Sequence, residues 1–200
     1  MKYLLSLAVC MFMGICAAQT VLLSENFASG LPVEWEVQTD GKRAWEFKTF
    51  RDASYMQMSA YAGKGKKGLK VKSTLFSPLL DLPGKQCSLR FSMANAFANG
   101  KPLRILLYTP KKTPSLEFAN EHFETLIDNP DFYNNIYKES DWIPMPIVSE
   151  PRYLAFVYDT HKVSATTTLQ IGEVDVWCVE VAQPESDALS ADEDDLVENG

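Results

Sequence analysis

The stretch SENFASGLPVEW, residues 24–35, contains the end of a strand, a turn and a tryptophan in quick succession. Together with the apolar residues 21–23 before it, the start of this stretch forms VLLSENF (21–27), which has the composition of a β-strand. Gly30 and Pro32 then interrupt the strand, because glycine and proline favour turns and disrupt regular strand pairing. This part of the chain therefore predicts a short strand followed by a tight corner, and the rest of the sequence repeats that pattern.

The residues before this stretch have the pattern of a secretory signal peptide. A short basic start precedes an apolar run, and Cys16 and Ala18 are the small residues expected before a cleavage site. We expect residues 1–18 to be removed, which predicts an exported protein that is secreted, periplasmic or at the cell surface. A lipoprotein anchor on Cys16 is less favoured, because residues 13–15 fit its usual pattern poorly. No later stretch approaches the roughly 18 apolar residues that a membrane-spanning helix needs.

From Val21 onward the chain has the pattern of short strands separated by turns that contain glycine or proline. The alternation of apolar and polar residues is clearest in residues 55–61 and 87–97. Such a pattern predicts one all-β domain over residues 19–182, an antiparallel β-sandwich. The expected strands are 21–27, 44–50, 55–61, 68–77, 87–97, 103–109, 153–160 and 166–181.

One segment has a helical pattern instead. Pro114 follows a candidate cap at Thr113, and apolar residues from Leu116 to Ile127 recur at helical spacing. We therefore expect a short amphipathic helix at 114–128, inside a long loop.

The same loop continues into an aromatic segment, DFYNNIYKESDW (131–142). Aromatic rings that are exposed on loops at the edge of a sandwich stack on sugar faces or anchor a protein partner. The alternative is that these rings hold the long loop against the domain. The candidate ligand-binding residues are Phe132, Tyr133, Tyr137 and Trp142.

Two cysteines, Cys87 and Cys178, lie within the predicted domain. Along its predicted strand, each is placed to face the same side as the neighbouring apolar residues. Two buried free thiols are the favoured interpretation, and a disulfide is the alternative that an exported chain permits. A disulfide here would close a loop of about 90 residues and contribute on the order of 4 kcal/mol to stability.

The net charge of −7 comes from the C-terminal end of the chain. Residues 183–200 hold seven acidic residues and no basic residue, so the rest of the expected mature chain is close to neutral. The sequence therefore lacks the basic footprint of a nucleic-acid-binding protein. The same residues include few large apolar side chains, which predicts a disordered acidic tail.

The stretch YAGKGKKGLKVK (61–72) combines glycines with five lysines. A phosphate-binding P-loop would lead into a helix, whereas this run leads into a predicted strand. We therefore expect a lysine-rich hairpin in which Gly63, Gly65 and Gly68 supply positive φ angles. Its lysines are candidates to meet an anionic glycan or the acidic tail.

The sequence contains no catalytic motif. His122 and His161 do not have a metal-binding spacing, and no Gly-x-Ser-x-Gly motif occurs. Both cysteines of the domain lie in apolar strands, unlike the exposed thiols of reactive sites. We expect a protein that is not an enzyme.

Five motifs in order resemble the choice-of-anchor J domain, which is related to the cleaved adhesin domains of exported bacterial proteins. The opening stretch supplies the first, and the second is Asp40-Gly41 followed by Trp45. The others are LFSPLLDL (75–82), LRF (89–91) and LQIGEV (169–174). The resemblance covers roughly residues 22–181. It implies a jelly-roll sandwich similar to galactose-binding and MAM domains, acting as an adhesive or accessory module.

Some members of that family hold structural calcium, and the resemblance implies Glu25, Asp40 and Glu173 as candidate ligands in this chain. The family's usual Asp-Asp pair is replaced by Gly172 and Glu173, and basic residues follow Asp40. Calcium prefers six to eight oxygen ligands, and the first departure removes a carboxylate that could supply one. The second departure places positive charge where the cation would bind.

These observations together predict a non-catalytic, secreted or surface-exposed module that binds a glycan, or a protein of the envelope or of a host. The alternative is a structural or assembly subunit of a bacterial envelope complex. Such a subunit would present a flat apolar patch or an unpaired edge strand.

Overall fold

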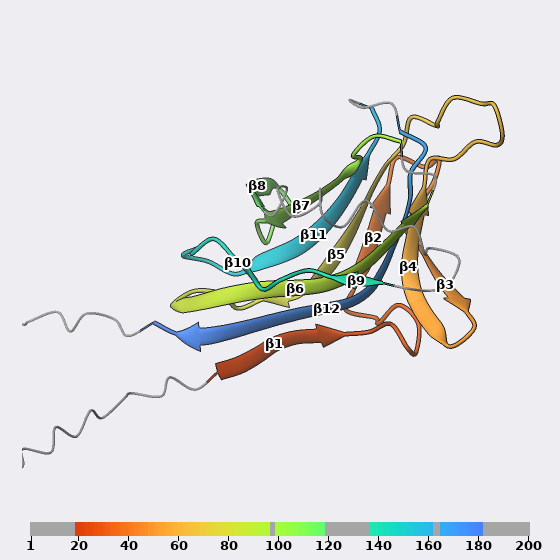
Figure 1. The fold of residues 1–200 in the computed structure, drawn as a ribbon. Helices are drawn as coiled ribbons and strands as arrows, with labels where there is room; N and C mark the ends of the chain where they lie inside the picture. Colours follow the sequence, from red (N-terminus) through yellow and green to blue (C-terminus); the bar gives the residue numbers. More distant parts are fainter. Residues whose placement is uncertain (1–18, 97–98, 119–136, 162–164, 182–200) are drawn as a thin grey trace, which may run out of the picture.

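The structure is a computed structural model, and it describes residues 19–96, 99–118, 137–161 and 165–181. These residues form two curled antiparallel sheets around a common core, and they contain no helix (Figure 1). The predicted all-β sandwich is confirmed. Within these ranges no helical segment has the length and apolar character required to cross a membrane. The predicted leader at 1–18 and the predicted tail at 183–200 lie outside the described residues.

The larger sheet contains seven of the described strands, in the order β10-β6-β12-β4-β3, with β1 beside β12 and β9 beside β6. The strands of this seven-stranded sheet are β1 (Gln19–Glu25), β3 (Glu46–Phe50), β4 (Ala53–Ser59), β6 (Lys85–Ala96), β9 (Lys138–Glu139), β10 (Ile143–Pro144) and β12 (Thr168–Glu180).

The smaller sheet contains the other five described strands, in the order β2-β5-β11-β7-β8. The strands of this five-stranded sheet are β2 (Glu36–Thr39), β5 (Lys72–Leu80), β7 (Leu103–Tyr108), β8 (Pro114–Phe118) and β11 (Arg152–Asp159). Its outer face carries a second, smaller apolar cluster around Phe76, Tyr108 and Val157.

The core lies between the sheets and follows from the alternation of side chains along each strand. On β6 the side chains of Leu89, Phe91 and Met93 point inward, as the sequence predicts. On β11 the inward side chains include Phe156, whose ring lies 5.8 Å from that of Phe91 in an edge-to-face arrangement. The two longest strands, β6 and β12, therefore supply one wall of the core, and the five-stranded sheet supplies the other.

The opening stretch turns twice and places two aromatic rings in the core. The amide of Gly30 donates to the carbonyl of Phe27, and that of Trp35 donates to the carbonyl of Pro32. Phe27 is fully buried and packs edge-to-face on Trp35, with the ring centres 5.2 Å apart. The strand and corner predicted from residues 24–35 therefore form as a packed unit.

The predicted helix at 114–128 is wrong for its first turn and lies outside the described residues beyond 118. Pro114–Phe118 forms β8, the edge strand paired with β7, in which Leu116 lies opposite Leu107. Ser115 Oγ also donates to the carbonyl of Leu107 at 2.9 Å. The backbone groups of this segment form hydrogen bonds with the open edge of β7. A helical pattern in the local sequence carries no information about such a partner.

The favoured interpretation of Cys87 and Cys178 as free thiols is also wrong. They are direct partners across β6 and β12, their Cα atoms lie 4.0 Å apart, and they form a disulfide. Both residues are buried in the core. Each cysteine alternates in step with the apolar residues of its own strand, so both side chains point into the core from adjacent strands. The two thiols can therefore be buried and bonded to each other at the same time.

Reducing this disulfide should destabilise the domain. A cross-link that spans 91 residues restricts the unfolded chain, and its loss should lower the free energy of unfolding by about 4 kcal/mol. Urea unfolding with and without reductant measures the difference. The control is the Cys87→Ala/Cys178→Ala variant, whose stability should not respond to reductant. Equal stability of the oxidised and reduced wild-type domain would contradict this expectation.

Candidate functional site

The outer surface of the seven-stranded sheet carries aromatic and charged side chains, and we call this surface the aromatic face. It arises from the alternation along β12, where Val174, Val176 and Cys178 point into the core. The residues between them, Asp175 and Trp177, therefore point outward.

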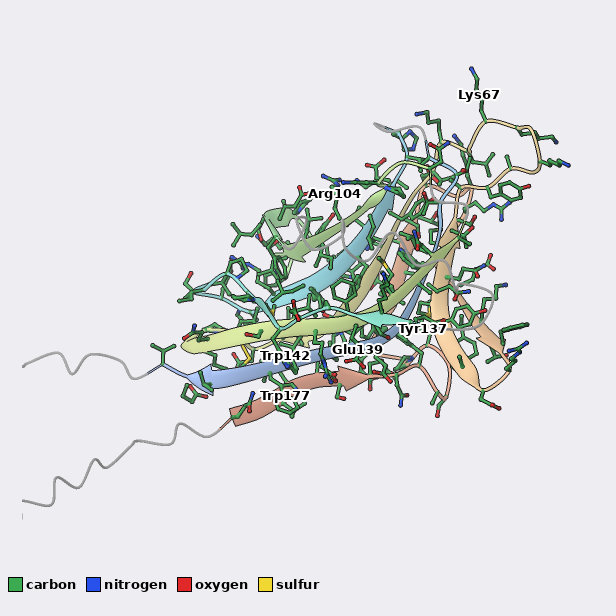
Figure 2. The ribbon with its side chains drawn as sticks, viewed as in Figure 1. Lys67, Arg104, Tyr137, Glu139, Trp142 and Trp177 are labelled. Carbon is green, nitrogen blue, oxygen red and sulfur yellow. A yellow bond between two sulfur atoms is a disulfide. The ribbon has the colours of Figure 1, made fainter. Side chains whose placement is uncertain are left out.

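Two tryptophans lie together on the aromatic face. Trp142, just before β10, and Trp177, on β12, have ring centres 5.1 Å apart at a tilt of 47°. β6 separates their strands, and the residue between them is Ser88, which pairs with Trp177 on one side and with Pro144 on the other. The small side chain of Ser88 leaves room for the rings to meet above the strand. Figure 2 shows both rings near the end of the sheet where β6 begins and β12 ends.

Arg90 orders the polar groups beside this pair. Its guanidinium carbon lies 4.9 Å from the ring centre of Trp142, a cation–π contact. Its Nη2 donates to Asp175 Oδ2 at 3.0 Å, and its Nη1 donates to Glu139 Oε2 at 3.5 Å. The hydrogen bond with Asp175 raises the pKa of Arg90 above its ordinary value. A fixed guanidinium between two carboxylates therefore borders the tryptophans.

Tyr137 occupies the other end of the aromatic face. Its hydroxyl donates to Gln170 Oε1 at 2.9 Å, and its ring lies 6.2 Å from that of Tyr55. The absence of a side chain at Gly172 makes room for the ring, since a Cβ there would lie 3.2 Å from Tyr137. Desolvation raises the pKa of Tyr137, so the hydroxyl stays protonated at neutral pH.

Two shallow grooves connect these ends. One, of about 410 Å³, is lined by Trp177, Arg90, Asp175 and residues of β1. The other, of about 340 Å³, is lined by Tyr137, Glu139 and neighbouring residues. Both grooves include Asn26 and Glu173, so they adjoin. A path with an aromatic group at each end and carboxylates between them therefore crosses the sheet.

The structure brings two of the four predicted ligand-binding residues to this face. Tyr137 is held against the sheet, whereas Trp142 is 38% exposed. Phe132 and Tyr133 lie outside the described residues. Sequence reasoning missed Arg90 and Trp177, although the parity of β12 provides a signal for Trp177. On a strand that buries one face in the core, a tryptophan at an outward-pointing position is a candidate ligand-binding residue.

The predicted calcium ligands do not form one set. Glu25 and Glu173 both line the 410 Å³ groove. Asp40 lies on the loop after β2, where its Oδ2 is 2.9 Å from His161 Nε2 and accepts the amide of Lys72 at 3.0 Å. The hydrogen bond with His161 lowers the pKa of Asp40. Among the described residues no group of three or more candidate ligands is placed to hold a metal. Calcium binding through Glu25 and Glu173 stays a prediction of the family resemblance.

Comparison with solved structures supports the fold. The K1 cleaved adhesin domain of Lys-gingipain from Porphyromonas gingivalis W83 is similar with a TM-score of 0.52 and 16% identity, over 78% of this chain and 97% of that chain. The K3 domain of the same protein gives 0.52 and 16%, over 80% and 99%. A point variant of a family 29 carbohydrate-binding module gives 0.44 and 18%, over 86% and 99%, a likeness too weak to carry an argument.

No protein-family model matches the chain, and no curated protein matches it. The similarity to the gingipain domains therefore shows that the chain has the fold of a cleaved adhesin domain, and it shows no more than the fold.

Replacing Tyr137 with phenylalanine should destabilise the aromatic face. The change leaves Gln170 Oε1 without its donor in a buried position, which should lower the free energy of unfolding by about 1–3 kcal/mol. Urea unfolding measures this loss. Tyr153→Phe is the matched control and should change stability little, because no hydrogen bond of the Tyr153 hydroxyl is seen within the described residues. Equal stabilities of the two variants would contradict the role of Tyr137.

Proposed function

We propose that this protein is a non-catalytic module that binds a glycan on its aromatic face. The observation that carries the proposal is the pair of Trp142 and Trp177, which lie 5.1 Å apart on the sheet surface beside an ordered arginine. Partly exposed tryptophans on a rigid sheet offer an apolar platform for the face of a sugar ring. The adjoining grooves offer hydrogen-bonding groups for its hydroxyls.

The charges of the aromatic face favour neutral sugars. Arg90 is the cation that borders the tryptophans, and it is already paired with Asp175 and Glu139. Glu25 and Glu173 add two further carboxylates to the grooves. Carboxylates accept hydrogen bonds from sugar hydroxyls but repel acidic groups. A neutral oligosaccharide therefore fits this face better than a sulfated or carboxylated one.

Several features support the wider proposal of an exported adhesin-like protein. The cleaved-adhesin fold is one, and the disulfide between Cys87 and Cys178 is typical of oxidising compartments. Membership of the choice-of-anchor J family is part of this proposal, and it rests on the five motifs in the sequence. The similar gingipain domains are adhesin domains, which agrees with binding rather than catalysis.

A role as an assembly subunit is the alternative, and β3 is the element that would serve it. It is paired on one side only within the described residues, and Phe47 and Phe50 are exposed there. Glu46 and Lys48 flank Phe47 along the strand and form an ion pair. Charged side chains on an edge strand oppose pairing with another chain. We therefore favour the glycan-binding function.

Removing either tryptophan should weaken glycan binding. A ligand is first identified on an array of neutral oligosaccharides, and isothermal titration calorimetry then gives its Kd for each variant. Trp177→Ala and Trp142→Ala should each weaken binding at least tenfold, which is about 1.4 kcal/mol. Phe50→Ala removes an exposed ring from β3 and is the matched control, expected to change Kd less than twofold. Unchanged affinity in both tryptophan variants, or no neutral ligand on the array, would contradict the proposal.

A further inference from the structure

The hairpin between β4 and β5 projects from one end of the sandwich (Figure 1), and Figure 2 shows Lys67 extending from its tip. The amide of Leu69 donates to the carbonyl of Ala60 at 2.8 Å and closes the hairpin. Gly63 and Gly65 have φ angles of 116° and 74°, so the two predicted positive angles are confirmed. We call residues 60–69 the lysine hairpin.

The base of the lysine hairpin is fixed to the domain. A Cβ at Gly68 would lie 1.9 Å from the carbonyl oxygen of Ala165, so the backbones touch there. The prediction of a positive φ at Gly68 is therefore wrong, and close backbone packing explains the glycine instead. The hydroxyl of Thr160 donates to the carbonyl of Leu69 at 2.6 Å and accepts the amide of Val71 at 2.9 Å. The tip thus holds its lysines away from the sheets on an anchored base.

The lysine hairpin forms one part of a larger basic surface. Lys42 on the neighbouring loop donates to the carbonyl of Lys70, and the amide of Lys72 donates to Asp40, so the two loops lie side by side. All the basic residues of this surface are exposed, and none forms an ion pair with a carboxylate of the described residues. We define this basic end as Lys42, Arg43, Lys64, Lys66, Lys67, Lys70 and Lys72.

These cations repel one another, and within the described residues no carboxylate forms an ion pair with them. Lys70 places its ammonium on the carbonyls of Thr160 and His161, which fixes the side chain but leaves the charge. Asp40 is the carboxylate in contact with this surface, and it is engaged by His161 and by backbone amides. An exposed cluster of one sign attracts a ligand of the opposite sign. The basic end therefore fits a ligand that carries several negative charges.

A groove beside the basic end suits a chain-like ligand. It has a volume of about 370 Å³, lies on the outer side of the five-stranded sheet, and includes Lys72, Gln38 and Thr74, with Tyr108 also in its lining. Polar and aromatic groups of this kind bind sugar rings. The tip residues 62–68 contain no large apolar side chain, so the hairpin has nothing to insert into a lipid bilayer.

We propose that the basic end binds an acidic polysaccharide, with its sulfate or carboxylate groups on the lysine hairpin and its chain directed along this groove. The lysines donate charge-assisted hydrogen bonds to the anionic groups. This site uses the opposite sheet from the aromatic face and does not depend on the function proposed for that face.

The probe is a heparin-derived octasaccharide, titrated into the disulfide-bonded domain at two salt concentrations. Lys66→Gln/Lys67→Gln should weaken binding about tenfold and reduce its salt dependence, because contacts to two anionic groups are lost. Lys48→Gln/Lys111→Gln removes the same charge from exposed positions elsewhere and should change Kd less than twofold. Trp177→Ala should also leave this affinity unchanged, which separates the test from that of the aromatic face.

Three results would overturn the proposal. The first is absence of octasaccharide binding at low salt. The second is an equal loss of affinity in the two double-lysine variants, which would indicate a response to net charge alone. The third is binding to vesicles of phosphatidylcholine and phosphatidylglycerol without binding to the octasaccharide, which would assign the basic end to a membrane surface.

Discussion

The pairing of β6 with β12 is the constraint on which the rest of the structure depends. It runs from Lys85 opposite Glu180 to Ala96 opposite Thr168. Because side chains alternate along a strand, a slip of one residue would turn every inward side chain outward. Trp177 would then enter the core, and Val176 would face solvent. The disulfide between Cys87 and Cys178 fixes the register that avoids this, and a shift between Ile171 and Glu173 places Gly172 beneath Tyr137.

The same architecture separates two kinds of charge. Carboxylates gather around Arg90 in the grooves of the seven-stranded sheet, whereas exposed lysines gather at the end of the sandwich beside the five-stranded sheet. A near-neutral domain can therefore offer an acidic aromatic surface and a basic surface at once. Local charge, rather than net charge, decides which ligand each surface attracts. If both proposals hold, the two sites would select different glycans, one neutral and one acidic.

The sequence predicted the core well, because alternation is a local property that one strand carries alone. Leu89, Phe91 and Met93 share a face in the sequence and in the structure. It did not predict β8, since the segment after Pro114 forms a strand only where the edge of β7 is available. It wrongly favoured free thiols over the disulfide for a similar reason, because strand order decides whether two buried cysteines become partners. The contact between Trp142 and Trp177 needs three strands in register, which no local pattern encodes.

The most direct test uses the indole N–H signals of the four tryptophans in a ¹H–¹⁵N spectrum. Trp35 and Trp45 are buried in the core, whereas Trp142 and Trp177 lie on the aromatic face. Titration with a neutral oligosaccharide that binds the domain should shift the signals of Trp142 and Trp177 and leave those of Trp35 and Trp45 in place. Binding that leaves both surface signals unmoved would contradict the account.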